Sequence, residues 1–239
     1  MQRVLQTIYP AHCPLCGEHV AEAAGLCAGC WREVRFLAGA LCETCALPLP
    51  GEPAPGETLQ CTRCQTAPPP WVQGRAALLY MGKGRSMALA LKHGERPGLA
   101  ALGALWMERA VRPILPADTL IVPVPLHWRR FVRRRFNQAD LIARPLARRL
   151  GCDYCPDALA RPAATIPLEG LGRAERAAAL AGAISAAPRR GARMAGRNVL
   201  IVDDVLTTGA TLQAAAAAAA GAGAASVRVA VLARVAENT

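Results

Sequence analysis

Aliphatic runs and helical stretches alternate along residues 75–239. Runs with few polar positions, which are typical of strands buried on both faces, occur at 75–81, 120–124, 199–202 and 227–232, and a short strand is expected near 153. Between them, apolar residues recur with helical spacing at 85–95, 99–112 and 137–150, and an alanine-rich helix is expected at 214–220. Strands that alternate with helices form a mostly parallel sheet flanked by helices, so the pattern predicts an α/β fold.

The first 65 residues follow a different pattern, with few large apolar side chains and many cysteines. Eight of the ten cysteines lie there as four Cys-x-x-Cys pairs: Cys13 with Cys16, Cys27 with Cys30, Cys42 with Cys45, and Cys61 with Cys64. Two pairs offer four thiolates to one tetrahedral zinc ion, and so small an apolar core needs such ions to fold. Sequential pairing predicts two structural zinc sites. Crossed pairing, and one occupied site with spare thiols, are the alternatives.

Composition and charge support a division of the chain. Proline- and glycine-rich runs at 48–56 and 68–70 place the boundary near residue 70, and the net charge is −2 for residues 1–66 and +13 for residues 67–239. We therefore expect a zinc-ribbon domain at 1–66, a linker at 67–74 and the α/β domain at 75–239. The N-terminus lacks the apolar core of a signal peptide and no run is apolar enough to span a membrane, so a cytoplasmic location is expected.

The segment 199–211 carries the strongest chemical signal. Its aliphatic run leads into Asp203 and Asp204, at the strand end where open α/β sheets bind ligands. Two adjacent carboxylates there suit a Mg²⁺ ion or the hydroxyls of a ribose. The small residues and threonines that follow, at 207–211, offer hydroxyls, free backbone N–H groups and a helix start to one phosphate. An ordinary threonine-capped helix is the alternative, but it leaves both acids without a role.

A second polar segment follows the strand at 120–124. The run Val124, Pro125 and Leu126 predicts a rigid loop whose amides could hold a departing pyrophosphate. Arginines follow directly, and they suit either that pyrophosphate, a solvated basic face or a nucleic-acid backbone. The nucleic-acid candidates are Arg129, Arg130, Arg133, Arg134 and Arg135.

The segment 199–211 closely resembles the phosphoribosyl pyrophosphate signature of type I phosphoribosyltransferases: four apolar residues, two acids, two residues and Thr-Thr-Gly-x-Thr. Nearly the whole chain resembles the ComF family of competence-associated proteins. Besides this signature, the resemblance rests on the cysteine pairs, Tyr80, Lys92 and the motifs Val-Pro-Val-Pro-Leu-His and Arg-Arg-Phe-Asn-Gln-Ala. The resemblance implies a double zinc ribbon, a type I phosphoribosyltransferase fold, and a link to the uptake or processing of single-stranded DNA.

The resemblance also implies roles for individual residues. Asp203 and Asp204 would be the catalytic acids that face the ribose, with Mg²⁺, and 124–126 the pyrophosphate loop. The phosphate would be bound by Val205, Thr207, Thr208, Gly209, Ala210 and Thr211. Candidates for a mobile loop over the substrate are Arg161, Thr165 and Arg176. Leu168, Ala179 and Ile184 depart from the family's usual glutamine, asparagine and aromatic residue, and Arg135 replaces a usual glycine. Binding is therefore implied more directly than turnover.

Three functions are compatible with these residues. The first is transfer of a phosphoribosyl group to an acceptor that the sequence does not identify. The second is a nucleic-acid-binding adaptor that uses the ribose-phosphate pocket as a sensor and its arginines, including those at 144–149, to contact single-stranded DNA. The third makes the zinc ribbons a docking platform for proteins of the competence machinery. For Trp31 and Trp71, packing is favoured over base stacking.

Overall fold

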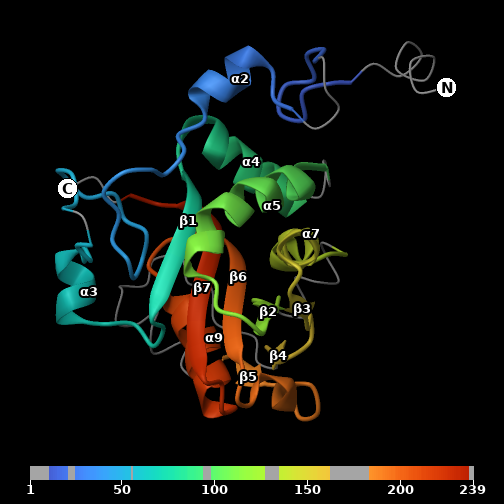
Figure 1. Ribbon diagram of the computed structural model, residues 1–239. Helices are drawn as coiled ribbons and strands as arrows, with labels where there is room; N and C mark the ends of the chain where they lie inside the picture. The colour runs from blue at the N-terminus through green and yellow to red at the C-terminus, as the bar shows by residue number, and fades with distance from the viewer. Residues whose placement is uncertain are drawn as a thin grey trace.

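The computed structural model describes residues 11–20, 25–54, 56–93, 98–126, 135–161 and 183–236 (Figure 1). Its centre is a five-stranded, wholly parallel sheet with the order β1-β7-β6-β2-β3. The strands are β1 (Gln73–Leu79), β2 (Thr119–Pro123), β3 (Asp153–Tyr154), β6 (Asn198–Leu206) and β7 (Ser226–Arg234). A two-stranded antiparallel sheet, β4 (Leu159–Ala160) with β5 (Ser185–Ala186), lies apart from it. The expected parallel α/β sheet is confirmed.

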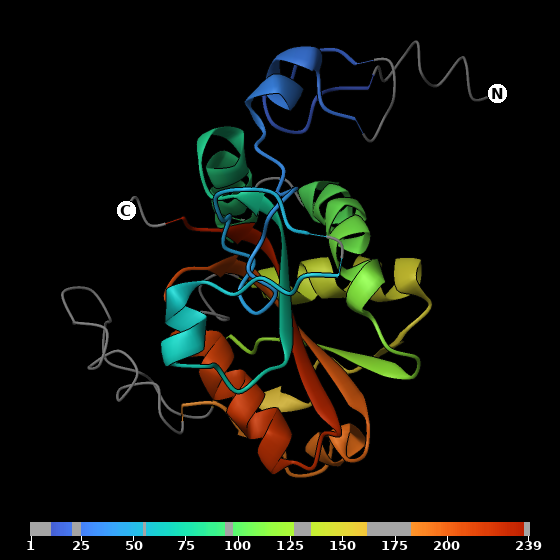
Figure 2. The same cartoon turned by 60° about the vertical axis from the view of Figure 1, so that its left-hand side comes forward.

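Helices cover both faces of the sheet (Figures 1 and 2). One face packs against α4 (Gly82–His93), α5 (Gly98–Val111) and α7 (Gln138–Leu150), and this core includes Leu200 and Val202 of β6. The other face packs against α9 (Ala210–Gly221) and includes the alternate residues Val199 and Ile201. Successive residues of a strand point to opposite faces, which is why the run at 199–202 is apolar throughout. Short 3₁₀ turns lie at Arg112–Ile114 and Gly191–Met194.

The structure extends several expected elements. Strand β6 continues four residues beyond the expected end at 202, because its pairing with β7 runs on to Leu206 opposite Arg234. The two aspartates therefore lie inside the ladder rather than after it. Strand β1 starts at Gln73, inside the expected linker, and α9 starts at Ala210, ahead of the alanine run.

The two cysteine-rich units occupy different places. The first, with the short helix α2 (Ala28–Glu33), has its own small core of Cys13, Cys27 and Cys30 and lies beyond α4 at one end of the molecule (Figure 2). The second, with the short helix α3 (Thr62–Thr66), shares the α9-side core of the sheet. The connection between them pairs with the edge strand β1: Leu37 N donates to Ala77 O (3.0 Å) and Leu79 N to Arg35 O (2.8 Å).

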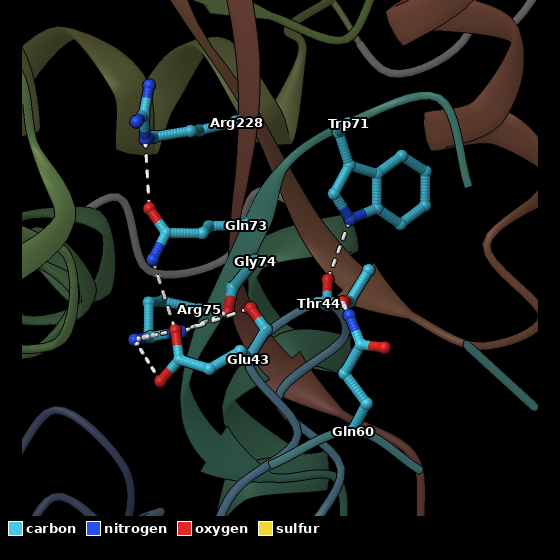
Figure 3. A network of polar contacts seen from close by, with 8 residues as sticks. All are labelled: Glu43, Thr44, Gln60, Trp71, Gln73, Gly74, Arg75 and Arg228. Atoms are coloured by element: carbon cyan, nitrogen blue, oxygen red, sulfur yellow. Dashed lines mark hydrogen bonds and ion pairs between the residues drawn. The ribbon is translucent and has the colours of Figure 1, made fainter. Parts of the chain in front are cut away.

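Strand β1 approaches the second unit so closely that one position requires glycine. A Cβ atom on Gly74 would lie 2.4 Å from the Thr44 carbonyl oxygen. Gly74 N donates to Glu43 O (2.9 Å), and Arg75 forms an ion pair with the Glu43 carboxylate at 2.6 Å (Figure 3). Two further bonds converge on Thr44: Trp71 Nε1 donates to its carbonyl (2.7 Å) and Gln60 Nε2 to its hydroxyl (3.1 Å). The second unit is thus fastened to the sheet.

Within the described ranges, none of the helices has the length and apolar character that crossing a membrane requires.

Candidate functional site

A polar cleft of about 320 Å³ lies at the carboxyl edge of the sheet. It is bounded on one side by the end of β6 and the turn that follows it, through Asp203, Asp204, Val205, Thr207 and Thr211. The loop after β2 forms the opposite wall, through Val124, Pro125 and Leu126. Because neighbouring parallel strands end at the same edge, these distant segments of the sequence face one cleft.

Asp203 and Asp204 form a pair of adjacent acids with few hydrogen-bond donors around them among the described residues. Asp204 is 9% exposed, and its Oδ2 atom has no hydrogen bond among the described residues, although Lys92 Nζ lies 3.4 Å away. Asp203 Oδ1 accepts a hydrogen bond from Asp204 N (2.8 Å). Burial and the adjacent Asp204 charge raise the pKa of Asp203 well above its usual value, more than Lys92 lowers it. The site therefore suits a ligand that brings positive charge or hydroxyl donors.

These acids fit a divalent cation as well as a ribose. Carboxylate oxygens are the ligands that Mg²⁺ prefers, and the ion is often bound by one or two carboxylates together with substrate phosphates. An unbonded, buried Oδ2 beside a second carboxylate has the capacity for such an interaction. Lys92 supplies only part of the compensating charge.

The turn after β6 has the shape of an anion cradle. Gly209 has φ 83°, a left-handed conformation that favours glycine, and α9 starts at the next residue. Among the described residues, no protein acceptor takes the N–H groups of Thr207, Thr208 or Gly209. Thr207 and Thr211 line the cleft, whereas Thr208 and Gly209 line a small hollow next to the second cysteine unit. Ala210 contributes the first residue of the helix.

The loop on the opposite wall is held by the start of α7. Val124 N donates to Val202 O (2.9 Å), which ties the loop to β6. Asn137 caps α7 by accepting from Ala139 N (3.1 Å), and its Nδ2 donates to Val124 O (2.9 Å). One asparagine side chain thus fixes both the helix and the proposed pyrophosphate loop.

Only some of the residues predicted for the mobile loop and for nucleic-acid contact lie within the described part of the chain. Arg161, a candidate for the mobile loop, lines the cleft. Thr165 and Arg176, together with Arg129, Arg130, Arg133 and Arg134, lie outside the described residues. Arg135 is exposed and has φ 62°, in the left-handed region where the resembling family has glycine. Ile184 is buried, 4% exposed.

Three residues line the cleft without having been assigned a role in it. They are Lys92, at the end of α4, and Asn137 and Gln138, at the start of α7. Gln138 is only 4% exposed although it is polar. The motif Phe-Asn-Gln at the start of a predicted helix was the available signal, because a capping residue and the first turn lie at the helix end that faces a ligand. For Lys92, no local pattern indicates its distant partner Asp204.

The cysteines form two separate clusters with zinc-binding geometry. Within each of the sets Cys13, Cys16, Cys27, Cys30 and Cys42, Cys45, Cys61, Cys64, all Sγ atoms lie within 4.8 Å of one another. The sequential pairing is confirmed. Hydrogen bonding with the Cys45 thiol lowers the pKa of Cys42 below its usual value. Four thiolates fit a structural zinc, which contributes folding energy when bound.

Comparisons with known proteins match both parts of the chain. Residues 4–66 match the double zinc ribbon domain, and residues 139–239 match the phosphoribosyl transferase domain. DNA utilization protein YhgH of Salmonella typhi is 36% identical over 231 residues, 94% of this chain and 97% of that protein. The Escherichia coli K12 protein of the same name is 35% identical over 233 residues, with the same coverage. Competence protein F of Haemophilus influenzae is 29% identical over 199 residues, 81% of this chain and 83% of that protein.

These matches run from the ribbon to the end of the transferase sheet rather than being confined to one motif. The chain therefore belongs to the ComF family, in which a double zinc ribbon precedes a phosphoribosyl transferase domain.

Proposed function

We propose that this protein binds phosphoribosyl pyrophosphate, or a related ribose 5-phosphate, together with Mg²⁺ in the cleft. The observation that carries the proposal is the convergence of two adjacent acids, a turn with free N–H groups and a second loop on one cleft. The 5-phosphate would bind at residues 207–211, the ribose hydroxyls at Asp203 and Asp204, and the pyrophosphate at residues 124–126. The volume of the cleft, about 320 Å³, suits a small ligand.

The same arrangement would support transfer of the phosphoribosyl group. An acceptor would displace pyrophosphate at the anomeric carbon, and the charge that develops on the ribose ring would be stabilised by Asp203 and Asp204. Bound Mg²⁺ would offset the charge of the pyrophosphate. The residues that line the cleft hold the ligand in orientation, which alone lowers a barrier substantially. We accordingly propose phosphoribosyltransferase activity with an acceptor still to be identified.

The names of the relatives suggest where such an activity is used. Proteins called DNA utilization protein and Competence protein F align with 81–94% of this chain. We propose a role in the uptake or processing of DNA in the cytoplasm, where proteins of the competence machinery and single-stranded DNA are its candidate partners.

Calorimetric titration tests the binding proposal. Phosphoribosyl pyrophosphate with Mg²⁺ should bind the native protein, and binding should be lost when Asp203→Asn and Asp204→Asn are combined. Release of pyrophosphate in the presence of candidate acceptors tests turnover separately. Binding without release with any acceptor supports a sensor rather than an enzyme.

A second candidate function, contact with single-stranded DNA, is favoured by an aromatic cleft of about 300 Å³ between the first cysteine unit and α5. It is lined by Trp31, Phe36, Trp106 and Arg109, among others. Trp31 and Phe36 are 48% and 37% exposed, and their ring centroids lie 4.9 Å apart. Exposed aromatic rings beside a cation suit base stacking next to a phosphate backbone. Packing was expected for both Trp31 and Trp71; Trp71 is buried, whereas Trp31 is half exposed.

Fluorescence anisotropy with a labelled oligonucleotide tests this second function. Trp31→Ala and Phe36→Ala should weaken binding of a single strand, and binding should decline steeply with salt. Val72→Ala, at another exposed apolar residue, provides the control. Equal affinity in all three variants would exclude the aromatic cleft as the DNA site.

A further inference from the structure

The second cysteine cluster reaches the turn at 207–209 through two arginines. Arg63 lies between the cluster residues Cys61 and Cys64, and its Nη2 donates a hydrogen bond to the Thr208 carbonyl oxygen. Arg234, the last residue of β7, donates from Nε to the Cys45 carbonyl oxygen (3.1 Å). Its Nη1 donates to the carbonyl oxygens of Leu206 and Thr207, each at 3.2 Å. Arg63 therefore bonds to the turn from a loop that carries cysteine ligands. Arg234 bonds both to such a loop, at Cys45, and to the turn.

Arg234 is buried and its partners are carbonyl oxygens. It is 3% exposed, and Nη1 also donates to the Val235 carbonyl oxygen. Among the described residues, no carboxylate forms an ion pair with Arg234. Charge-assisted hydrogen bonds to a carbonyl are about twice as strong as neutral ones. The buried Arg234 therefore holds the peptide groups whose carbonyl oxygens it binds. Because no described carboxylate neutralises it, its positive charge remains behind the turn.

The direction of these bonds determines where the amides of the turn point. In a planar trans peptide, the carbonyl of one residue and the N–H of the next point in opposite directions. The carbonyls of Leu206, Thr207 and Thr208 point to the two arginines, so the N–H groups of residues 207–209 point away from them. Those N–H groups have no protein acceptor in the described part of the chain. The two arginines line the hollow behind the turn, not the ligand cleft.

Close packing reinforces this connection. The indole N–H of Trp71 is bonded to Thr44, between the cysteines of the second cluster (Figure 3). Its ring packs against the turn, because a Cβ atom on Gly209 would lie 3.6 Å from Trp71 Cη2. The hollow left between the second unit and the turn is about 20 Å³, which is room for about one water molecule. The turn therefore has little space to rearrange on that side.

We infer that Arg63 and Arg234 are positioning residues that couple the second zinc cluster to the phosphate turn. They orient the amides at 207–209 for a phosphate, and a zinc ion on Cys42, Cys45, Cys61 and Cys64 would hold the loops on which both contacts depend. The first cluster, which has a core of its own, does not take part. The inference rests on the proposed function for the identity of the ligand, but the orientation of the turn can be measured without any ligand.

Hydrogen exchange followed by mass spectrometry, on peptides that cover residues 203–212 of the full chain without ligand, tests the coupling directly. Arg63→Ala and Arg234→Lys should each increase exchange about tenfold at the amides of this segment that are bonded within the sheet, at the end of β6, because a charged hydrogen bond that holds the adjoining turn is lost. Arg228→Lys is the matched control: Arg228 lies on the same strand but binds Gln73 and Ser226. Zinc content, measured for every variant, should stay at the native value.

Titration with ribose 5-phosphate provides the second readout. Affinity should fall about tenfold in Arg63→Ala and Arg234→Lys and stay native in Arg228→Lys. If Arg234→Lys does not fold, the Arg63→Ala variant still tests the coupling, because Arg63 is only half-buried. Native exchange at 203–212 in Arg63→Ala, with native zinc content, overturns the inference. If the native protein binds no ribose phosphate, the proposed function fails, and the exchange experiment still decides whether the coupling exists.

Comparing the two clusters separates zinc from the arginines. Cys61→Ser with Cys64→Ser should increase exchange at 203–212, whereas Cys27→Ser with Cys30→Ser should leave that segment unchanged. An equal response to both pairs would contradict a specific connection through the second cluster.

Discussion

The Nζ atom of Lys92 lies 3.4 Å from Oδ2 of Asp204, across the cleft edge between α4 and β6. Within the described residues, this is the only ion pair that either aspartate forms, and it places a positive charge beside one of the two neighbouring carboxylates. Lys92 also lowers the pKa of Asp203, against the larger effects of burial and of Asp204. The lysine therefore keeps the acid pair compatible with a folded protein.

Replacing Lys92 tests how far the stability of the folded protein depends on this compensating charge. Lys92→Gln should lower the free energy of unfolding by about 1 kcal/mol, because a partly buried carboxylate loses its cation. Chemical denaturation measures the change. Lys92→Arg keeps the charge and should stay near the native value, and equal losses in both variants would point to packing instead.

The raised pKa of Asp203 predicts a pH dependence of stability with a definite sign. A carboxyl group whose pKa is higher in the folded state stabilises the protein below its unfolded pKa, about 3.9, and that stability is lost as pH rises through the folded pKa. Asp203→Asn does not titrate, so its melting temperature should fall less than that of the native protein between pH 4 and neutrality. Thermal unfolding at a series of pH values measures the difference.

Glu108 provides a control of opposite sign. Hydrogen bonding to Arg112, and then to Arg149, lowers its pKa, so its stabilising effect is present above the unfolded value of about 4.3 and lost as pH falls through the lower folded pKa. Glu108→Gln should lose stability at neutral pH. Parallel pH profiles of stability for Glu108→Gln and Asp203→Asn would contradict the raised pKa of Asp203.

The close approach of β1 to the second cysteine unit predicts intolerance at Gly74. Gly74→Ala should destabilise the protein by about 2 kcal/mol or more, because the added Cβ atom would meet the Thr44 carbonyl oxygen at 2.4 Å. Gly221→Ala, where nothing lies within 4 Å of the added atom, should be tolerated. Similar melting temperatures for the two variants would show that the second unit is not packed on the sheet as described.

The left-handed conformation of Arg135 predicts a stabilising substitution. Arg135→Gly should raise the free energy of unfolding by up to about 1 kcal/mol, since φ 62° is costly for a residue with a side chain. The reverse change, Gly151→Ala at φ 68°, should lower it by a similar amount although the site is open. Chemical denaturation of both variants checks the pair, and a loss of stability in Arg135→Gly would contradict the conformation.

The strands and helices of the sheet could be predicted because they are apolar in a periodic way. The runs around Leu120 and Leu200 are buried on both faces, so no polar position interrupts them. The continuation of β6 through Asp203 could not be predicted, because its acids break the apolar pattern while backbone pairing with β7 persists. Strands β4 and β5 have two residues each, too few for a pattern to form.

The candidate site was predictable where one segment carries the chemistry. Asp203, Thr207 and Thr211 follow one another in a single motif, and all line the cleft. Contacts between distant segments left no local signal: Arg234 reaches Cys45, and Lys92 reaches Asp204, only through the fold. The roles assigned to residues 203–211, and the division of the chain at 67–74, stay predictions.

Titration of the full-length protein with phosphoribosyl pyrophosphate and Mg²⁺, by calorimetry, tests the central claim most directly. One ligand should bind per chain in the native protein, and no heat of binding should remain when Asp203→Asn and Asp204→Asn are combined in a folded variant. Equal binding by the native and the doubly substituted protein, or none by either, would contradict a ribose-phosphate site at this cleft.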